Sequence, residues 1–409
     1  MSRSDAKAPH QPAAISWARY RTWARENTPL WLWHIVFLAV LLIVVRSDIV
    51  NAVYLMLVLF PAVAIAGIAD YRAVLSSWTV RAALAFLVFL WLSPLWTGGA
   101  GAAHWQNATL AMATVASFVM ITAHLVATGT KDQDRLLKVL AILALVATLY
   151  SAITEYQSQW FSARLVILPW ENPNTGAAVI GVLLVGIAAG PGLNTEEWPG
   201  TRLLYWLVAV LLALLLFMTQ TRAAMVGVVA AAVACVLARP PKLRHMAIWA
   251  AGALAVAGLV LFVFRDRLLR GDAGRGELIV DFWRLVQDRI LTGFGVQAEG
   301  QILVWYNGGY LEAPHNMLMT ALVYGGVIAA ALLAALYVTM IAVGFRNGRR
   351  GLSLAPLAMA AYVTVHGLFE TIYVTTPGWQ WLYLWLPVGL VAGAELRGRS
   401  TAARTSWPP

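Results

Sequence analysis

Residues 265–320 read RDRLLRGDAGRGELIVDFWRLVQDRILTGFGVQAEGQILVWYNGGYLEAPHNMLMT and form the longest polar interruption in an otherwise apolar chain. The stretch contains six arginines and no lysine, and Pro314-His315-Asn316 leads into the next apolar run. Because a bilayer interior leaves polar groups unsatisfied, a basic segment of this length must lie outside it. We therefore expect this stretch to carry the function of a membrane protein.

The rest of the chain reads as membrane spans. Of the 409 residues, 60% are hydrophobic and only 12% are charged, whereas roughly a quarter of a soluble protein is charged. A span needs about 20 apolar residues, and we predict an all-α polytopic membrane protein with about twelve transmembrane helices. The predicted spans are 29–46, 49–69, 77–96, 107–128, 135–154, 174–191, 202–220, 222–238, 244–264, 314–344, 352–373 and 378–396.

The predicted organisation follows from these spans. The basic start of the chain lacks a small-residue cleavage site after the first span, which favours a retained cytoplasmic tail over a signal peptide. The single cysteine, Cys235, excludes a disulfide framework. The regions are an N-terminal tail (1–28), transmembrane helices one to nine (29–264), a periplasmic loop (265–313), transmembrane helices ten to twelve (314–396) and a C-terminal tail (397–409).

The distribution of basic residues sets the orientation. Lysine and arginine accumulate in cytoplasmic loops, and with the N-terminus inside, all four lysines fall on the cytoplasmic side. Both termini are then cytoplasmic, and the long loop lies on the opposite face. The net charge of +10 favours contact with anionic membrane lipid. Nucleic acid is excluded as a partner because the chain has no soluble basic domain.

The outer face keeps arginines where the positive-inside rule expects few cations. They are Arg46, Arg164, Arg222 and the six of the long loop, Arg265, Arg267, Arg270, Arg275, Arg284 and Arg289. The planar guanidinium holds phosphate or carboxylate through two parallel hydrogen bonds. Individual arginines can instead snorkel to lipid headgroups or pair with nearby aspartates. The set as a whole, with no lysine in it, favours an anion site on this face.

Shorter polar segments could contribute to that site. Arg164 precedes Asn172-Pro173-Asn174, a turn that we expect to cap the next helix through Asn174 or to face the site. Thr221-Arg222 lies at a tight hairpin between two apolar runs, where an arginine is costly unless it snorkels or is paired.

Residues 275–290 have the periodicity of an amphipathic helix. The apolar face comprises Leu278, Ile279, Phe282, Trp283, Leu285, Val286 and Ile290, and the polar face comprises Glu277, Asp281, Arg284 and Asp288. The segment is too short and too polar to span, so we expect it to lie in the interface plane. Arg275 begins it, where the helix dipole disfavours a cation, which makes this residue a functional candidate. Gly293-Phe294-Gly295 then ends the helix in a turn.

His315 is the candidate general base. Pro314 suits the first turn of a helix, which puts His315 at the positive helix end, where a neutral imidazole is favoured. A capping or headgroup-binding histidine is the alternative. His366 and Glu370 are one helical turn apart, which predicts a buried pair that is either a structural tie or a support for a residue of the site, and we favour the structural tie. No HExxH motif, cysteine pair or clustered carboxylates occur on the outer face, so we expect a metal-independent site without a cofactor.

Taken together, the outer segments resemble the O-antigen ligase and polymerase family of bacterial envelope enzymes. The residues that carry this resemblance are Arg164 with the NPN turn at 172–174, the Thr221-Arg222 hairpin, RGELIVDFW from Arg275 running into Gly293-Phe294-Gly295, and PHNMLMTALVYGG from Pro314 to Gly326. Their order and spacing agree with the family along 174–344, and the number of spans agrees over the whole chain.

The resemblance implies a glycosyltransferase of the bacterial inner membrane, acting at its periplasmic face. The donor would be a glycan linked to polyprenyl (undecaprenyl) diphosphate. The acceptor would be a sugar hydroxyl of lipid A–core in a ligase, or another lipid-linked repeat in a polymerase. A transporter or flippase of an anionic lipid-linked solute is the alternative of a different class, because its arginines would bind cargo without needing a base.

The family's functional positions match Arg222, Arg275 and His315. In this reading the two arginines hold the diphosphate, and His315 takes the proton of the acceptor hydroxyl in one inverting displacement. Further substrate-binding candidates are Arg164, Arg265, Asn172, Asn174 and Asn316.

Overall fold

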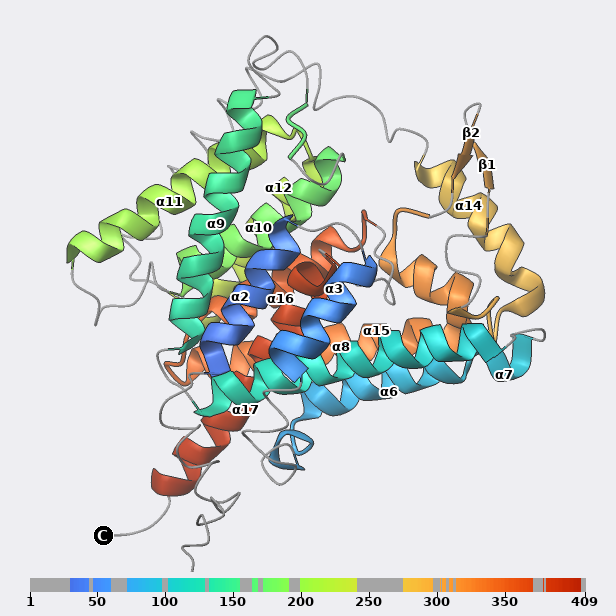
Figure 1. The fold of residues 1–409 in the computed structure, drawn as a ribbon, viewed down its shortest axis with the longest axis horizontal. Coiled ribbons are helices and arrows are strands. Elements are labelled where there is room, and N and C mark those ends of the chain that lie inside the picture. The colour runs from blue at the N-terminus through green and yellow to red at the C-terminus, as the bar shows by residue number, and fades with distance from the viewer. Residues whose placement is uncertain are drawn as a thin grey trace, which may run out of the picture.

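The computed structural model describes residues 30–43, 47–59, 72–97, 102–128, 132–154, 164–167, 172–190, 199–240, 275–296, 302, 304–306, 309–311, 314–370, 378 and 380–405. This part of the chain is almost entirely helical (Figure 1). Its helices are α2 (Leu30–Ile43), α3 (Ser47–Tyr54), η1 (Leu55–Leu59), α6 (Trp78–Leu92), α7 (Pro94–Thr97), α8 (Ala102–Thr128), α9 (Asp132–Thr154), α10 (Pro173–Ala189), α11 (Pro199–Met218), α12 (Arg222–Ala238), α14 (Arg275–Val286), η3 (Gln287–Arg289), α15 (Met317–Arg349), α16 (Ala355–His366), η5 (Trp381–Trp385) and α17 (Leu386–Thr405).

The predicted helical class is confirmed, and a helix lies in every predicted span that the described residues cover. The predicted span at 244–264 lies outside them. By length and composition, five of the described helices can cross a membrane: Trp78–Trp96, Trp105–Thr128, Gln133–Thr154, Gly200–Met218 and Met317–Arg349. The structure also contains an antiparallel hairpin that the sequence did not predict, in which β1 (Val304–Tyr306) pairs with β2 (Gly309–Leu311).

The centre of the molecule is formed by α10, α16, η5 and residues 386–395 of α17, and the side chains of these segments are nearly all buried. Helix α16 packs against both α10 and α12. The Tyr362 hydroxyl donates to the Ala177 carbonyl oxygen at 3.0 Å, and a Cβ at Gly181 would lie 2.1 Å from that hydroxyl oxygen. This close helix packing, in which small residues let helices approach, is typical of membrane proteins.

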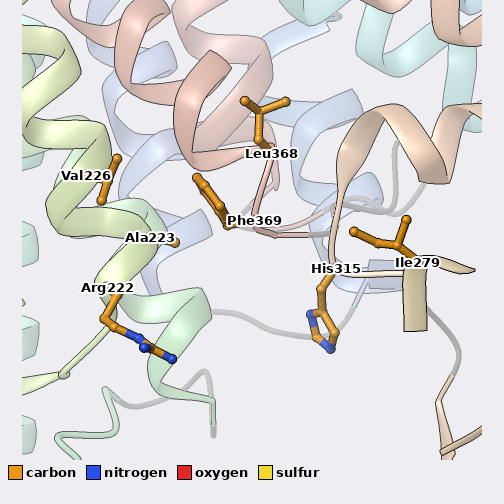
Figure 2. Close-up of a pocket in the computed structure, with 7 residues that line it drawn as sticks. All are labelled: Arg222, Ala223, Val226, Ile279, His315, Leu368 and Phe369. Carbon is orange, nitrogen blue, oxygen red and sulfur yellow. The ribbon is translucent and has the colours of Figure 1, made fainter. Parts of the chain in front are cut away.

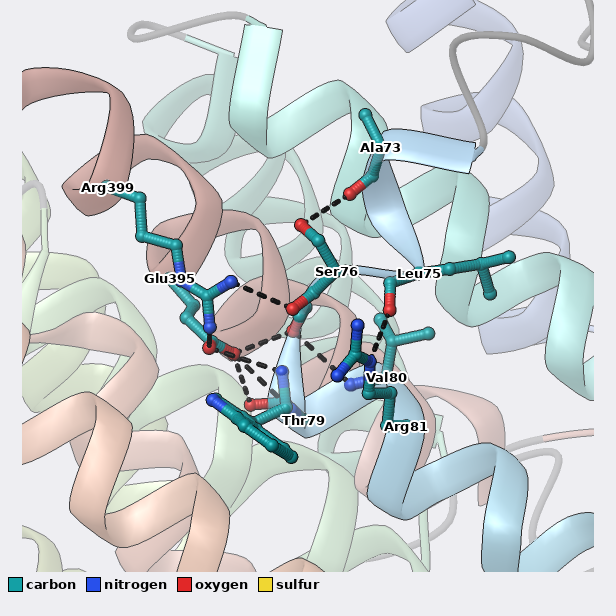
Figure 3. Close-up of polar contacts among 10 residues, drawn as sticks. Ala73, Leu75, Ser76, Thr79, Val80, Arg81, Glu395 and Arg399 are labelled. Atoms are coloured by element: carbon teal, nitrogen blue, oxygen red, sulfur yellow. Dashed lines mark hydrogen bonds and ion pairs between the residues drawn. The ribbon is translucent and has the colours of Figure 1, made fainter. Parts of the chain in front are cut away.

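A buried carboxylate joins α17 to the beginning of α6. Glu395 on α17 accepts hydrogen bonds from the Ser77 hydroxyl at 2.7 Å, the Trp78 amide at 3.2 Å and the Thr79 hydroxyl at 3.2 Å (Figure 3). Arg399 pairs with the same carboxylate. The first amides of a helix lack intrahelical partners and carry partial positive charge, so Glu395 completes α6 from a distant part of the chain.

The longest helix, α15, is interrupted at Gly326, where φ is 67° and ψ is −169°. The turn that follows α14 fills this interruption. The Phe294 amide donates to the Val323 carbonyl oxygen at 2.8 Å, and the Gly295 amide donates to that of Tyr324 at 2.8 Å. In return, the Val327 amide donates to the Ile290 carbonyl oxygen at 2.7 Å. Backbone groups that the kink frees from the helix are thus satisfied by the neighbouring segment.

The predicted amphipathic helix is present as α14 and η3, and it packs on α15. Leu278 and Phe282 are buried against Val323 and Tyr324. Trp283, on the same predicted apolar face, is 41% exposed. Contact with α15 therefore covers only part of the apolar face, and an interfacial helix would present the rest to lipid. Whether α14 also lies in the interface plane stays a prediction.

The kink generates the first prediction. A Cβ at Gly326 would lie 2.2 Å from the carbonyl carbon of Leu291, and the backbone conformation is one that only glycine adopts readily. We expect Gly326→Ala to lower the free energy of unfolding by about 1–3 kcal/mol from conformation alone, with the backbone clash adding to that loss. Thermal denaturation of the purified protein in detergent measures it.

Gly351→Ala is the matched control. Gly351 also has a positive φ, 85°, but nothing lies within 4 Å of its added Cβ. Gly351→Ala therefore introduces the strain of a positive φ without a steric clash at the added Cβ. If the two variants lose equal stability, the packing of the turn against the kink of α15 does not contribute as argued.

Candidate functional site

A cavity of about 340 Å³ lies where four parts of the chain meet. It is lined by Arg222, Ala223 and Val226 of α12, Ile279 of α14, His315 before α15, and Leu368 and Phe369 after α16. Figure 2 shows Arg222 and His315 on opposite sides of the cavity, with Phe369 between them. Two residues singled out from the sequence for their chemistry, far apart along the chain, therefore line one cavity.

Arg222 stands at the beginning of α12. It follows Thr221, the N-cap residue, and its side chain is exposed. The turn that connects α11 to α12 comprises only residues 219–221, in agreement with the predicted tight hairpin, and Gln220 has a φ of 55° within it. The neighbouring cavity residues on α12, Ala223 and Val226, are apolar. The guanidinium is therefore a cation at the edge of an apolar wall.

His315 does not lie in the first turn of the following helix, contrary to the prediction. Helix α15 begins at Met317, and Asn316 caps it by accepting a hydrogen bond from the Met319 amide at 3.0 Å. Because Asn316 takes the cap position, Pro314 and His315 precede the helix, and His315 adopts a left-handed φ of 49°. The Asn316 amide also donates to the Leu368 carbonyl oxygen at 3.0 Å, so this side chain joins two cavity segments.

A carboxylate contacts the imidazole of His315. Its Nδ1 lies 3.2 Å from Oε1 of Glu370, and the two side chains are 30% and 9% exposed. A carboxylate accepts hydrogen bonds, so a neutral imidazole that donates from Nδ1 to Glu370 would carry its lone pair on Nε2. The contact also orients the ring.

The sequence did not predict the contact between Glu370 and His315. It paired Glu370 with His366 by helical spacing, but α16 ends at His366 and the chain continues in turns through 367–369. The Tyr383 hydroxyl lies 2.8 Å from Nδ1 of His366.

The loop arginines are only partly described. Arg275 is the first residue of α14, as predicted, one turn before the cavity residue Ile279. Arg265, Arg267 and Arg270 lie outside the described residues. Arg284 pairs with Asp281 at 3.2 Å on the exposed side of α14, in agreement with the sequence-based expectation for this side chain.

Arg164 is engaged in a network next to Arg222. Its Nε donates to the Thr219 carbonyl oxygen at 2.9 Å, and a terminal nitrogen donates to the Thr221 hydroxyl at 3.0 Å and to the Asn174 side chain. The predicted cap on α10 is shifted. Asn172 caps the helix by accepting from the Asn174 amide at 2.9 Å, because Pro173 occupies the first helical position, where its missing N–H is not needed.

These features define a helical, multi-pass membrane protein with an arginine and a histidine at one cavity. Residues 207–334 match the family model described as O-antigen ligase, and this range includes Arg222, Arg275 and His315. An O-antigen ligase from Pseudomonas aeruginosa is 27% identical over 274 residues, which is 64% of this chain and 65% of that relative. The chain thus matches somewhat less than two thirds of the relative's length. Both comparisons confirm the predicted resemblance.

The contacts of Arg164 generate the second prediction. Lysine lacks the planar fork that reaches several acceptors at once. We expect Arg164→Lys to lower the free energy of unfolding by about 1.5–3 kcal/mol, as for other hydrogen bonds that involve a charged group. Glycan transfer, if this protein carries it out, should fall only in proportion to the folded fraction.

Arg202→Lys on α11 is the control, because the described residues include no hydrogen bond or ion pair to Arg202. Thermal unfolding and activity of both variants are compared. Loss of activity in Arg164→Lys at unchanged stability would mean that Arg164 contacts substrate instead of supporting the turn.

Proposed function

We propose that this protein is a glycosyltransferase of the O-antigen ligase type. It transfers a glycan from polyprenyl diphosphate to a sugar hydroxyl of lipid A–core at the periplasmic face of the bacterial inner membrane, with both termini in the cytoplasm. The observation that carries the proposal is that Arg222 and His315 line one cavity. The match of residues 207–334 to the O-antigen ligase family supports it.

His315 is the general base in this proposal. The contact between Nδ1 and Glu370 leaves Nε2 to take the proton of the acceptor hydroxyl. A carboxylate behind the imidazole also stabilises the imidazolium that forms, as in other histidine-based catalytic sites. Glu370 is a positioning residue, because it acts through His315.

The arginines hold the leaving group. A diphosphate needs cations that stay charged when partly desolvated, and guanidinium meets this requirement. Arg222 contributes from α12 and Arg275 from the beginning of α14. Their charge stabilises the negative charge that develops on the departing diphosphate, and an apolar cavity strengthens that interaction.

The reaction balances without an added reagent. The acceptor oxygen forms a bond to the anomeric carbon while the bond from that carbon to the diphosphate oxygen breaks, and His315 receives the hydroxyl proton. The products are the glycosylated acceptor and polyprenyl diphosphate. One direct displacement inverts the anomeric centre.

The proposed reaction uses no metal ion, because the arginines compensate the charge of the diphosphate. Transfer should therefore persist when a chelator is added in excess. Loss of activity that Mg²⁺ restores would contradict this prediction.

The apolar lining suits a lipid-linked donor. Leu368 and Phe369 are exposed apolar residues, and Val226 and Ile279 extend the apolar surface. A polyprenyl chain can lie along such a surface while its diphosphate faces the arginines. The cavity thus offers apolar contacts and a cation to the two parts of an amphiphilic donor.

His315→Ala tests the base. A general base contributes about 10²–10⁴-fold to the rate, so transfer should fall by that factor while donor binding persists. Purified protein is incubated with lipid-linked glycan and lipid A–core, and the gel shift of the acceptor is measured. Lengthening of the lipid-linked glycan, with lipid A–core left unmodified, would indicate a polymerase.

His366→Ala is the control for His315→Ala. His366 is fully buried and hydrogen-bonded to Tyr383, so its loss should reduce thermal stability and activity together. Near wild-type transfer by a folded His315→Ala variant would reject the base and favour a carrier of lipid-linked solute.

Substitution of the arginines tests the diphosphate clamp. Arg222→Lys and Arg275→Lys should each lower transfer by about 10²–10³-fold, comparable to the alanine variants, because lysine cannot form the bidentate contact. Arg284→Ala is the control, since that exposed side chain pairs with Asp281. Full activity of both lysine variants would show that these positions do not grip the diphosphate.

A further inference from the structure

A second groove lies between α6 and α15. Its volume is about 510 Å³, and it is lined by Trp78, Arg81 and Ala82 of α6 and by Val338, Thr339, Ala342, Val343 and Arg346 of α15. None of these residues takes part in the cavity that contains His315. The groove is therefore a surface distinct from the candidate active site.

The groove is amphipathic. Arg81 belongs to the first turn of α6, and Arg346 belongs to the last turn of α15. The remaining wall is mostly apolar, and its exposed members include Trp78, 58% exposed, and Val338, 68% exposed. Exposed apolar side chains on a membrane protein face acyl chains, and tryptophan is enriched at the level of the headgroups. The lining thus has a cationic end and an apolar body.

The two cations keep capacity for an external anion. Arg81 donates through Nε to the Leu75 carbonyl oxygen at 2.7 Å and lies 5.1 Å from the centre of the Trp78 ring. In the part of the chain that the structure describes, no carboxylate pairs with Arg81 or Arg346. Both guanidinium groups line this groove, and a phosphate bound there would accept charge-assisted hydrogen bonds from them.

The cationic end is held rigidly. Glu395 accepts from the Trp78 and Thr79 amides, and Arg399 donates to the Ser76 carbonyl oxygen at 2.8 Å (Figure 3). These bonds fix the turn before α6 and therefore the positions from which Trp78 and Arg81 project. A preorganised site loses less conformational entropy when its ligand binds.

The groove lies toward the opposite end of α15 from the His315 cavity. His315 precedes the beginning of α15, whereas Arg346 lies in its last turn. Residues 327–346 alone rise about 30 Å along the helix, which is close to the thickness of the hydrocarbon core. A single headgroup near His315 cannot reach Arg346, so the groove is a separate binding surface.

We propose that this groove binds an anionic glycerophospholipid of the leaflet opposite the His315 cavity. Its phosphate lies between Arg81 and Arg346, and one acyl chain runs along Val338 and Ala342. The proposal is independent of glycan transfer, because it rests on a separate surface.

Native mass spectrometry of the full chain tests the proposal. The protein in detergent is titrated with phosphatidylglycerol, or with phosphatidylcholine as the zwitterionic comparison, and bound lipid is counted. An arginine near an anionic lipid surface contributes about 1 kcal/mol, so Arg81→Gln with Arg346→Gln should weaken phosphatidylglycerol binding roughly thirtyfold. Arg349→Gln is the control, since Arg349 stacks on Phe345 and does not line the groove.

A second variant isolates the apolar part. Ala342→Trp fills the groove without changing its charge and should also reduce phosphatidylglycerol binding, with size-exclusion chromatography confirming that the variant is folded. Equal retention of both lipids, or unchanged binding by the double arginine variant, would overturn the proposal. So would competition by glycerophosphoglycerol at the concentration of the lipid, because the acyl chains would then contribute nothing.

Discussion

The exchange of backbone hydrogen bonds between residues 290–295 and the kink of α15 is the constraint on which the candidate site depends. Phe294 and Gly295 donate to carbonyl groups that α15 leaves free at Gly326, and Val327 donates back to Ile290. These bonds replace helical ones, so the long helix can bend without leaving polar backbone groups unsatisfied in an apolar environment. They also hold α14 against α15, which places the cavity residue Ile279 and the N-terminal end of α14 on the same side of the molecule as His315.

Backbone contacts fix the other side of the cavity as well. The Met317 amide donates to the Gly367 carbonyl oxygen at 2.8 Å, and Asn316 reaches the Leu368 carbonyl oxygen. The segment after α16 therefore lies against the beginning of α15, and this places the Glu370 carboxylate in contact with the imidazole of His315. The Arg164 network fixes the turn before Arg222 in the same way. Side chains that could act on a substrate are thus positioned by neighbours that do not act on it, which preorganises a site.

Much of the fold was predictable from the sequence, because the length and spacing of apolar runs determine where membrane helices form. The sequence also selected Arg222 and His315, since a cation or an imidazole at the edge of an apolar run is costly. The contact between His315 and Glu370 was not predictable, because it depends on how the chain turns after α16. The kink at Gly326 was not predictable either. The sequence contains glycines in both 290–295 and α15, but it does not show that these two segments contact each other.

The bond network around Glu395 has a consequence for how the chain matures. The Thr79 amide and the carboxylate that accepts from it are separated by 316 residues. A ribosome delivers α6 to the membrane long before α17 exists, and during that interval the first amides of α6 must be satisfied by water or lipid headgroups. A helix that is synthesised much later therefore completes the beginning of α6. Until α17 is in place, the beginning of α6 lacks the carboxylate that accepts from it in the folded protein.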